Sequence, residues 1–164
     1  VGFGSSGGPP MLNVLYNNNY QIVQSPGYVM IMVEMNHDAR IIRLNSEFNP
    51  DNMRRWLGDS IGSWEGNTLV VKTKNHHPQQ KFRAAIRHQI LISEGAEITE
   101  RFTRVGKNEI LYQFEVNDNE AYKDVWKGEM PLRASQERIY EYACHEGNYA
   151  MANILAGARA EEEQ

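Results

Sequence analysis

The sequence predicts a mainly β protein, namely an antiparallel β-barrel with one short helix and a C-terminal helix. Short apolar stretches of strand length recur at steady spacing, and Gly, Pro, Asn and Asp separate them. In the clearest stretch, residues 109–117, apolar and polar side chains alternate as in a strand with one buried face. About eight to ten such strands indicate a barrel or sandwich rather than a parallel α/β sheet.

A barrel is favoured over a sandwich because several strands place charged and apolar residues on one face. Glu100, for example, lies between Ile98 and Phe102 in the two-residue alternation of a strand. A lined cavity tolerates such a charge better than a dry sandwich core does. We therefore expect a lipocalin-like or calycin-like barrel.

The N-terminal residues 1–10 are rich in Gly, Ser and Pro and predict a flexible arm. A single barrel domain is expected to follow over residues 11–160, with residues 161–164 as an acidic tail. Strands are expected at residues 11–16, 20–24, 28–35, 40–44, 61–64, 68–74, 97–105, 109–117, 125–132 and 138–144. Residues 82–92 fit either a strand or a helix.

Two helices are expected from their end signals and composition. Asn49 is a good N-cap, Pro50 suits a first helical position and Gly58 a helix stop, which predicts a short helix over residues 49–57. Residues 148–159 are rich in small residues and predict the C-terminal helix.

Length and charge limit the classes of protein to which the chain can belong. A chain of 164 residues suits one domain with a proper core. The formal charge of −4 argues against a general nucleic-acid binder, which usually shows a basic face. No apolar run approaches the roughly 20 residues that a spanning helix needs, so no transmembrane segment is expected. The single Cys144 is either a buried small hydrophobe or the partner of a thiol outside the chain.

Several short motifs together resemble an uncharacterised family of exported bacterial proteins. They are GGPPM at 7–11, YQIVQ at 20–24, WLGDS at 56–60, WEGNTLVV at 64–71, ERF at 100–102 and YEYAC at 140–144. The hairpin motif of the family has the form W-E-G-D-T-L-V-V, and Asn67 stands here at its Asp position. The resemblance implies a secreted or periplasmic protein and a cysteine just before Gly2 as partner of Cys144, but Val1 stands at that position here. It implies no activity, cofactor or catalytic residue.

Glu34, His37, Asp38 and Arg40 form the first candidate site, because they interrupt an otherwise apolar run. Charge in such a place is costly unless it is paired or useful. A Glu34–Arg40 pair across the hairpin is expected, and His37 beside Asp38 would suit a general base with an orienting carboxylate. The alternative is a solvated turn with one structural ion pair.

Glu100, Arg101 and Glu141 form the second candidate site, as charges on strand faces that would line a barrel. The alternative is that Arg40, Arg101 or Arg138 neutralises these carboxylates structurally. Aromatic residues, among them Trp64, Tyr112 and Tyr140, would line a cavity or a sugar-binding surface, or else belong to the core. No metal-ligand spacing, phosphate loop or dinucleotide motif is present, so neither metal nor cofactor is expected.

Two functions remain open on these residues. The first is a non-enzymatic exported module that binds a small apolar or sugar-like ligand, or assembles with copies of itself through the N-terminal arm. Its ligand would contact Arg40, Trp64, Glu100, Arg101, Tyr112, Tyr140 and Glu141. The second is an acid-base enzyme, a lyase, isomerase or hydrolase, with Glu34, His37 and Asp38 as its catalytic groups.

Overall fold

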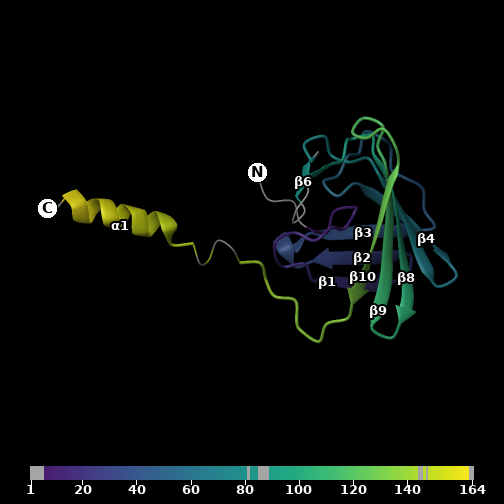
Figure 1. Cartoon of the computed structure of the whole chain (residues 1–164), viewed down its shortest axis with the longest axis horizontal. Coiled ribbons are helices and arrows are strands. Elements are labelled where there is room, and N and C mark those ends of the chain that lie inside the picture. Colours follow the sequence, from purple (N-terminus) through teal and green to yellow (C-terminus); the bar gives the residue numbers. More distant parts are fainter. Residues whose placement is uncertain (1–5, 81, 85–88, 144–145, 147, 163–164) are drawn as a thin grey trace.

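A computed structural model describes residues 6–80, 82–84, 89–143, 146 and 148–162. It contains ten strands, a single 3-10 turn and one α-helix within these residues (Figure 1). They are β1 (Tyr20–Ser25), β2 (Tyr28–Val33), η1 (Met35–His37), β3 (Ala39–Leu44), β4 (Asp59–Glu65), β5 (Thr68–Lys74), β6 (Phe82–Ala84), β7 (Gln89–Leu91), β8 (Glu97–Gly106), β9 (Glu109–Asn117), β10 (Trp126–Arg133) and α1 (Ala150–Glu162).

Eight of the strands form one curled sheet in the order β1-β2-β3-β4-β5-β8-β9-β10 (Figure 1). Neighbouring strands are antiparallel except β3 and β4, which are parallel. The mainly β prediction is confirmed, but the prediction of a closed barrel is wrong. The sheet is an open half-barrel, because the pairing of its described residues ends at β1 on one side and β10 on the other.

The hairpin turns follow the glycines that the sequence places there. Gly27, between β1 and β2, has a φ of +79°, and Gly66, between β4 and β5, has a φ of +61°. Both values lie in the left-handed region that glycine adopts without a Cβ penalty. The β8–β9 hairpin turns at residues 106–108 beside a register shift between Arg104 and Gly106. These three hairpin turns border one end of the half-barrel.

The inner face of the curled sheet carries the core. Strand alternation and register place on it Ile31, Ile42, Leu69, Val71, Ile98, Phe102, Tyr112, Phe114 and Val116, all of them buried. Gly128 on β10 belongs to the same face, and a Cβ built there would lie 2.4 Å from Cζ of Phe114. The absent side chain leaves the room that the Phe114 ring occupies.

The segment before β1 differs from the expected flexible arm. Residues 6–10 are buried, and Met11 is fully buried among the core residues of the sheet. The hydroxyl of Tyr20 donates to the carbonyl of Ser6 at 3.1 Å. The segment therefore fills one end of its own half-barrel, and residues 1–5 lie outside the described part.

Three predicted elements are absent from the described residues. Residues 49–57 form turns instead of a helix, because their backbone bonds residues 75–77: Arg55 donates its N–H to Asn75 and accepts one from His77. Residues 11–16 and 138–143 form no strand. The ambiguous stretch at residues 82–92 contains the short β6–β7 pair, a sheet of its own.

The C-terminal helix is confirmed as α1, and it continues to Glu162, so the first residues of the expected acidic tail are helical. Figure 1 shows α1 away from the sheet, and all its described residues are exposed. No helix in the described part is long and apolar enough to cross a membrane.

Candidate functional site

A buried ion pair links two strands that are not neighbours in the sheet. Arg40 on β3 donates from Nη1 and Nη2 to the two carboxylate oxygens of Glu100 on β8, at 2.5 and 3.0 Å. The two side chains are 2% and 0% exposed. A two-pronged guanidinium–carboxylate contact has defined geometry as well as charge. The pair therefore spans the concave face of the half-barrel across β4 and β5.

Tyr112 and Met11 complete this arrangement, here called the Arg40–Glu100 cluster. The Tyr112 hydroxyl donates to Glu100 Oε1 at 2.7 Å and accepts the backbone N–H of Met11 at 2.8 Å. Nη2 of Arg40 also lies 3.6 Å from the Met11 sulfur. The cluster thus connects β3, β8, β9 and the N-terminal segment by contacts that use most of its polar groups.

The electrostatics of the cluster favour the ion pair with a protonated tyrosine. Burial, together with the charge of Glu100, raises the pKa of Tyr112 well above the usual 10.0. Burial also raises the pKa of Tyr20. For Arg40, burial acts to lower the pKa, but the attraction and hydrogen bonds of Glu100 outweigh it, so the pKa is raised. The cluster holds its protons more firmly than exposed groups would.

A cavity of about 960 Å³ occupies the other end of the half-barrel. Its apolar lining comes from inward positions on six of the strands and from one residue after β10: Tyr20, Ile22, Val29, Ile31, Leu69, Phe102, Ile110, Met130, Leu132 and Ile139. Residues beside the three hairpin turns border its mouth: Gln24, Trp64, Asn67, Arg104, Lys107 and Asn108. We call it the hairpin cavity.

The first predicted site anchors the chain after β10 instead of forming a charge pair. Glu34 accepts from Asn19 Nδ2 at 2.7 Å and from the backbone N–H of Tyr140 at 3.0 Å. His37 Nε2 accepts the backbone N–H of Tyr142 at 2.7 Å. The predicted Glu34–Arg40 pair is wrong, because Arg40 faces inward to Glu100.

These two side chains hold residues 137–142, here called the C-terminal segment, beside the hairpin cavity. Two residues of the segment, Glu137 and Ile139, line the cavity. His37 has a φ of +53°, which is uncommon for a residue other than glycine. The surroundings of His37 therefore hold its backbone in this conformation. Asp38 beside it is half-buried.

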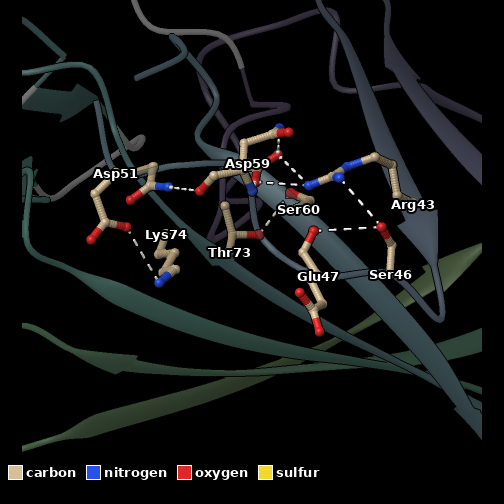
Figure 2. Close-up of polar contacts among 10 residues, drawn as sticks. Arg43, Ser46, Glu47, Asp51, Asp59, Ser60, Thr73 and Lys74 are labelled. Carbon is tan, nitrogen blue, oxygen red and sulfur yellow. Dashed lines mark hydrogen bonds and ion pairs between the residues drawn. The ribbon is translucent and has the colours of Figure 1, made fainter. Parts of the chain in front are cut away.

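Asp59 forms a third polar cluster that sequence reasoning missed. Figure 2 shows its carboxylate facing Arg43, whose Nη2 lies 3.0 and 2.9 Å from the two oxygens. The same carboxylate accepts the backbone N–H and side-chain Nδ2 of Asn49, at 2.7 and 2.9 Å. Ser60 and Thr73 share a hydroxyl contact next to it. With its acceptors occupied, Asp59 ties the β3–β4 connection to the sheet.

The remaining predicted residues are dispersed. Trp64 borders the hairpin cavity. Arg101 is exposed and forms an ion pair with Glu65 at 2.8 Å, on the face opposite to Glu100. Tyr140 and Glu141 are exposed in the C-terminal segment, and the backbone N–H of Tyr140 donates to Glu34. Cys144 lies outside the described residues.

The structure thus brings Arg40, Glu100 and Tyr112 together and leaves Arg101 apart. Sequence reasoning missed the role of Met11 and most of the cavity lining. The alternation of Ile110 with Tyr112 was a usable signal for the lining, since it places both on one face. The described residues contain no group of three or more His, Cys, Asp or Glu side chains placed to hold a metal ion.

The geometry carries the functional argument by itself. Comparison of the chain with protein-family models, with curated proteins and with solved structures found no match.

Proposed function

We propose that the chain is a non-enzymatic binding module that takes a small apolar ligand into the hairpin cavity. The observation that carries this proposal is the cavity itself. Its volume of about 960 Å³ falls at the upper end of the roughly 300–1,000 Å³ of ligand pockets, and its inner wall is apolar.

The partial burial of the wall supports the same proposal. Ile22, Ile110, Met130 and Leu132 occupy inward positions but are only partly buried. Removing apolar side chains from water lowers the free energy by roughly 25 cal/mol per Å² of apolar surface buried. A ligand that covers them would supply the burial that the chain leaves incomplete.

An apolar ligand is favoured over a sugar-like one by the chemistry of the wall. A sugar needs hydrogen-bonding groups along its length, whereas the inward positions of β1, β9 and β10 at the cavity are apolar except for Gln24 at the mouth and for the Tyr20 hydroxyl, which bonds Ser6. The aromatic ring of Trp64 at the mouth suits either an apolar or a sugar-like ligand. The other polar lining groups lie at the mouth, in residues 13–19 before β1 and in residues 133–137 at the end of β10 and after it.

The enzymatic alternative has less support. Glu34 and His37 direct their acceptor atoms to backbone N–H groups of the C-terminal segment. A general base must instead reach the proton of a substrate. Both residues therefore serve to position the segment that forms one side of the cavity.

Export and assembly are further parts of the proposal with separate support. The resemblance to exported bacterial proteins supports export. The N-terminal segment gives no support to assembly through the arm, because residues 6–10 are buried in their own half-barrel. Fractionation of the source cells and light scattering of the purified chain test these two parts.

The binding proposal is tested with Nile red, an uncharged dye whose fluorescence rises in apolar surroundings. We expect saturable fluorescence with the purified chain. The Ile110→Trp substitution places a large ring in the cavity and should abolish the signal. Its matched control is Ile41→Trp, on the exposed face of β3, which should leave binding unchanged. Absence of saturable binding, or equal loss in both variants, would overturn the proposal.

A further inference from the structure

The mouth of the hairpin cavity carries cations, although the chain as a whole has a charge of −4. Arg104, Lys107 and Arg133 line the cavity together with two carboxylates, Glu109 and Glu137. The cavity therefore has a positive balance in an acidic protein. Such a local excess attracts anions.

Arg104 is placed on the cavity side by the pattern of β8. It continues the inward row of Glu100 and Phe102 and pairs in register with Ile110. Its guanidinium donates from Nε to the carbonyl of Gly106 at 3.1 Å and from Nη2 to that of Lys107 at 2.9 Å. These bonds fix the group and leave it without a carboxylate partner among the described residues.

Lys107 lies at the tip of the β8–β9 hairpin and also forms no ion pair within the described part of the chain. Arg133 differs, since its Nε lies 3.6 Å from Oε2 of Glu109. Within the described lining, Arg104 and Lys107 are thus the cations outside an ion pair, and they outnumber the one remaining carboxylate, Glu137. Two amide side chains, Asn67 and Asn108, line the same end and can donate hydrogen bonds to an oxygen anion.

The far end of the interior offers no competing anchor. Glu100 already accepts from Arg40 and from Tyr112, and Met11 covers the cluster. An anionic group would meet a filled and compensated site there. A ligand with one charged end must therefore keep that end at the mouth and direct its apolar part inward.

We propose that the ligand is a free, single-chain amphiphile with an anionic head, such as a medium-chain carboxylate. This inference rests on the proposed binding function and adds the chemical class of the ligand. The tail occupies the wall formed by Ile22, Ile110 and Met130, and the carboxylate lies between Arg104 and Lys107. Added salt should then weaken the contact of the charged head and leave the contact of the apolar tail unchanged.

The test compares three ligands with the same tail and different heads, decanoate, decanol and decyltrimethylammonium, each below its aggregation limit. Each ligand displaces Nile red from the purified chain at low salt. We expect decanoate to bind about fivefold or more tighter than decanol, since one partly exposed charge contact gives about 1 kcal/mol. The trimethylammonium ligand should bind most weakly, and high salt should bring decanoate close to decanol.

Two variants locate the head. Arg104→Gln combined with Lys107→Gln should remove the preference for decanoate and leave the affinity for decanol unchanged. The matched control is Lys72→Gln, an exposed cation on β5 outside the cavity, which should keep the preference. A mouth variant that retains the preference would overturn the inference.

The outcomes separate the two proposals. If no ligand of the series displaces the dye and the dye itself does not bind, the binding function fails. If decanoate and decanol bind equally, the function stands and the anionic class is wrong. Binding to anionic lipid vesicles without binding of monomeric decanoate would also contradict the free-ligand proposal.

Discussion

The two ends of the half-barrel interior combine polarity and packing in opposite ways. The end closed by the N-terminal segment contains an ion pair and a tyrosine, yet it is filled, and Arg40, Glu100 and Tyr112 are each at most 2% exposed. The hairpin end is lined by Ile22, Ile110 and Met130, yet it is hollow. Charge at the first end therefore stabilises the fold, and apolar surface at the second end is available to a ligand.

This contrast shows that the unusual residues of a sequence are not always its functional ones. A buried charge attracts attention because it is costly to desolvate, but here each charge has a partner. An isoleucine is an ordinary residue in a sequence. An isoleucine that faces an empty space in the structure nevertheless says more about ligand binding than a buried charge that already has its partner. Four substitutions test this contrast between the filled end and the hollow end.

The largest effect is expected at the filled end, from Glu100→Gln. The change leaves the Arg40 charge buried without its counter-charge, which should lower the free energy of unfolding by about 3–5 kcal/mol. Urea denaturation of the two proteins measures it. Replacing both partners, Arg40→Met with Glu100→Leu, should recover much of this loss. A double variant as unstable as the single one would contradict the view that the pair is structural.

The next effect is expected at Gly128→Ala, on the wall between the two ends. The new Cβ would lie 2.4 Å from Cζ of Phe114, so the ring must move. Overpacking of this kind costs about 1–3 kcal/mol of the free energy of unfolding. Thermal denaturation measures it, with Gly157→Ala as control, since a Cβ there meets nothing within 4 Å. Equal behaviour of the two variants would show that Phe114 has room to yield.

A pH-dependent effect is expected from Tyr112. Because its pKa is raised in the folded state, the unfolded chain loses the tyrosine proton first, near pH 10.0. Stability should therefore be intact below pH 10.0 and fall as pH rises above it, by up to about 1.4 kcal/mol per pH unit for one such group.

Tyr112→Phe should reduce this alkaline slope and cost about 1–3 kcal/mol at neutral pH, through the lost bonds to Glu100 and Met11. Urea denaturation at several pH values checks both effects. Tyr28→Phe, at an exposed tyrosine, is the matched control. An unchanged slope in Tyr112→Phe would refute the assignment.

The smallest effect is expected from His37→Asn, at the side of the hollow end. Asn tolerates the left-handed φ of this position but does not reproduce the imidazole bond to Tyr142. We expect at most about 1 kcal/mol in global stability. The C-terminal segment should show faster amide hydrogen exchange and weaker Nile red binding. Unchanged exchange at Tyr140 and Tyr142 would mean that the contact does not hold the segment.

The local parts of the fold could be predicted because their signals are local. The alternation of Ile110, Tyr112, Phe114 and Val116 identifies β9, and Gly27 marks the turn between β1 and β2 by its chemistry alone. The short helix was mispredicted because the backbone of Arg55 donates to Asn75 and accepts from His77, residues about 20 positions away in the sequence. These distant backbone partners replace the hydrogen bonds of a helical turn, and the local end signals do not reveal them.

The candidate site depended on contacts that no local pattern contains. Arg40 and Glu100 are 60 residues apart, and Met11 reaches Tyr112 across 101 positions. Strand alternation placed Glu100 on the inner face, and Arg40 was one of three arginines considered as its partner. The hollow at the other end could not be predicted, because a sequence specifies which residues face inward but not how much space remains between them.

The single parallel step between β3 and β4 determines how the two edges of the sheet relate. In an eight-stranded sheet with only antiparallel neighbours, the first and last strands run in opposite directions. Here one parallel pair reverses that parity, so β1 and β10 run in the same direction. Closing the ring would require a second parallel pairing, with slanted instead of perpendicular hydrogen bonds. The direction of one strand therefore favours a seam that stays open, and the two strands beside it, β1 and β10, both contribute residues to the wall of the cavity.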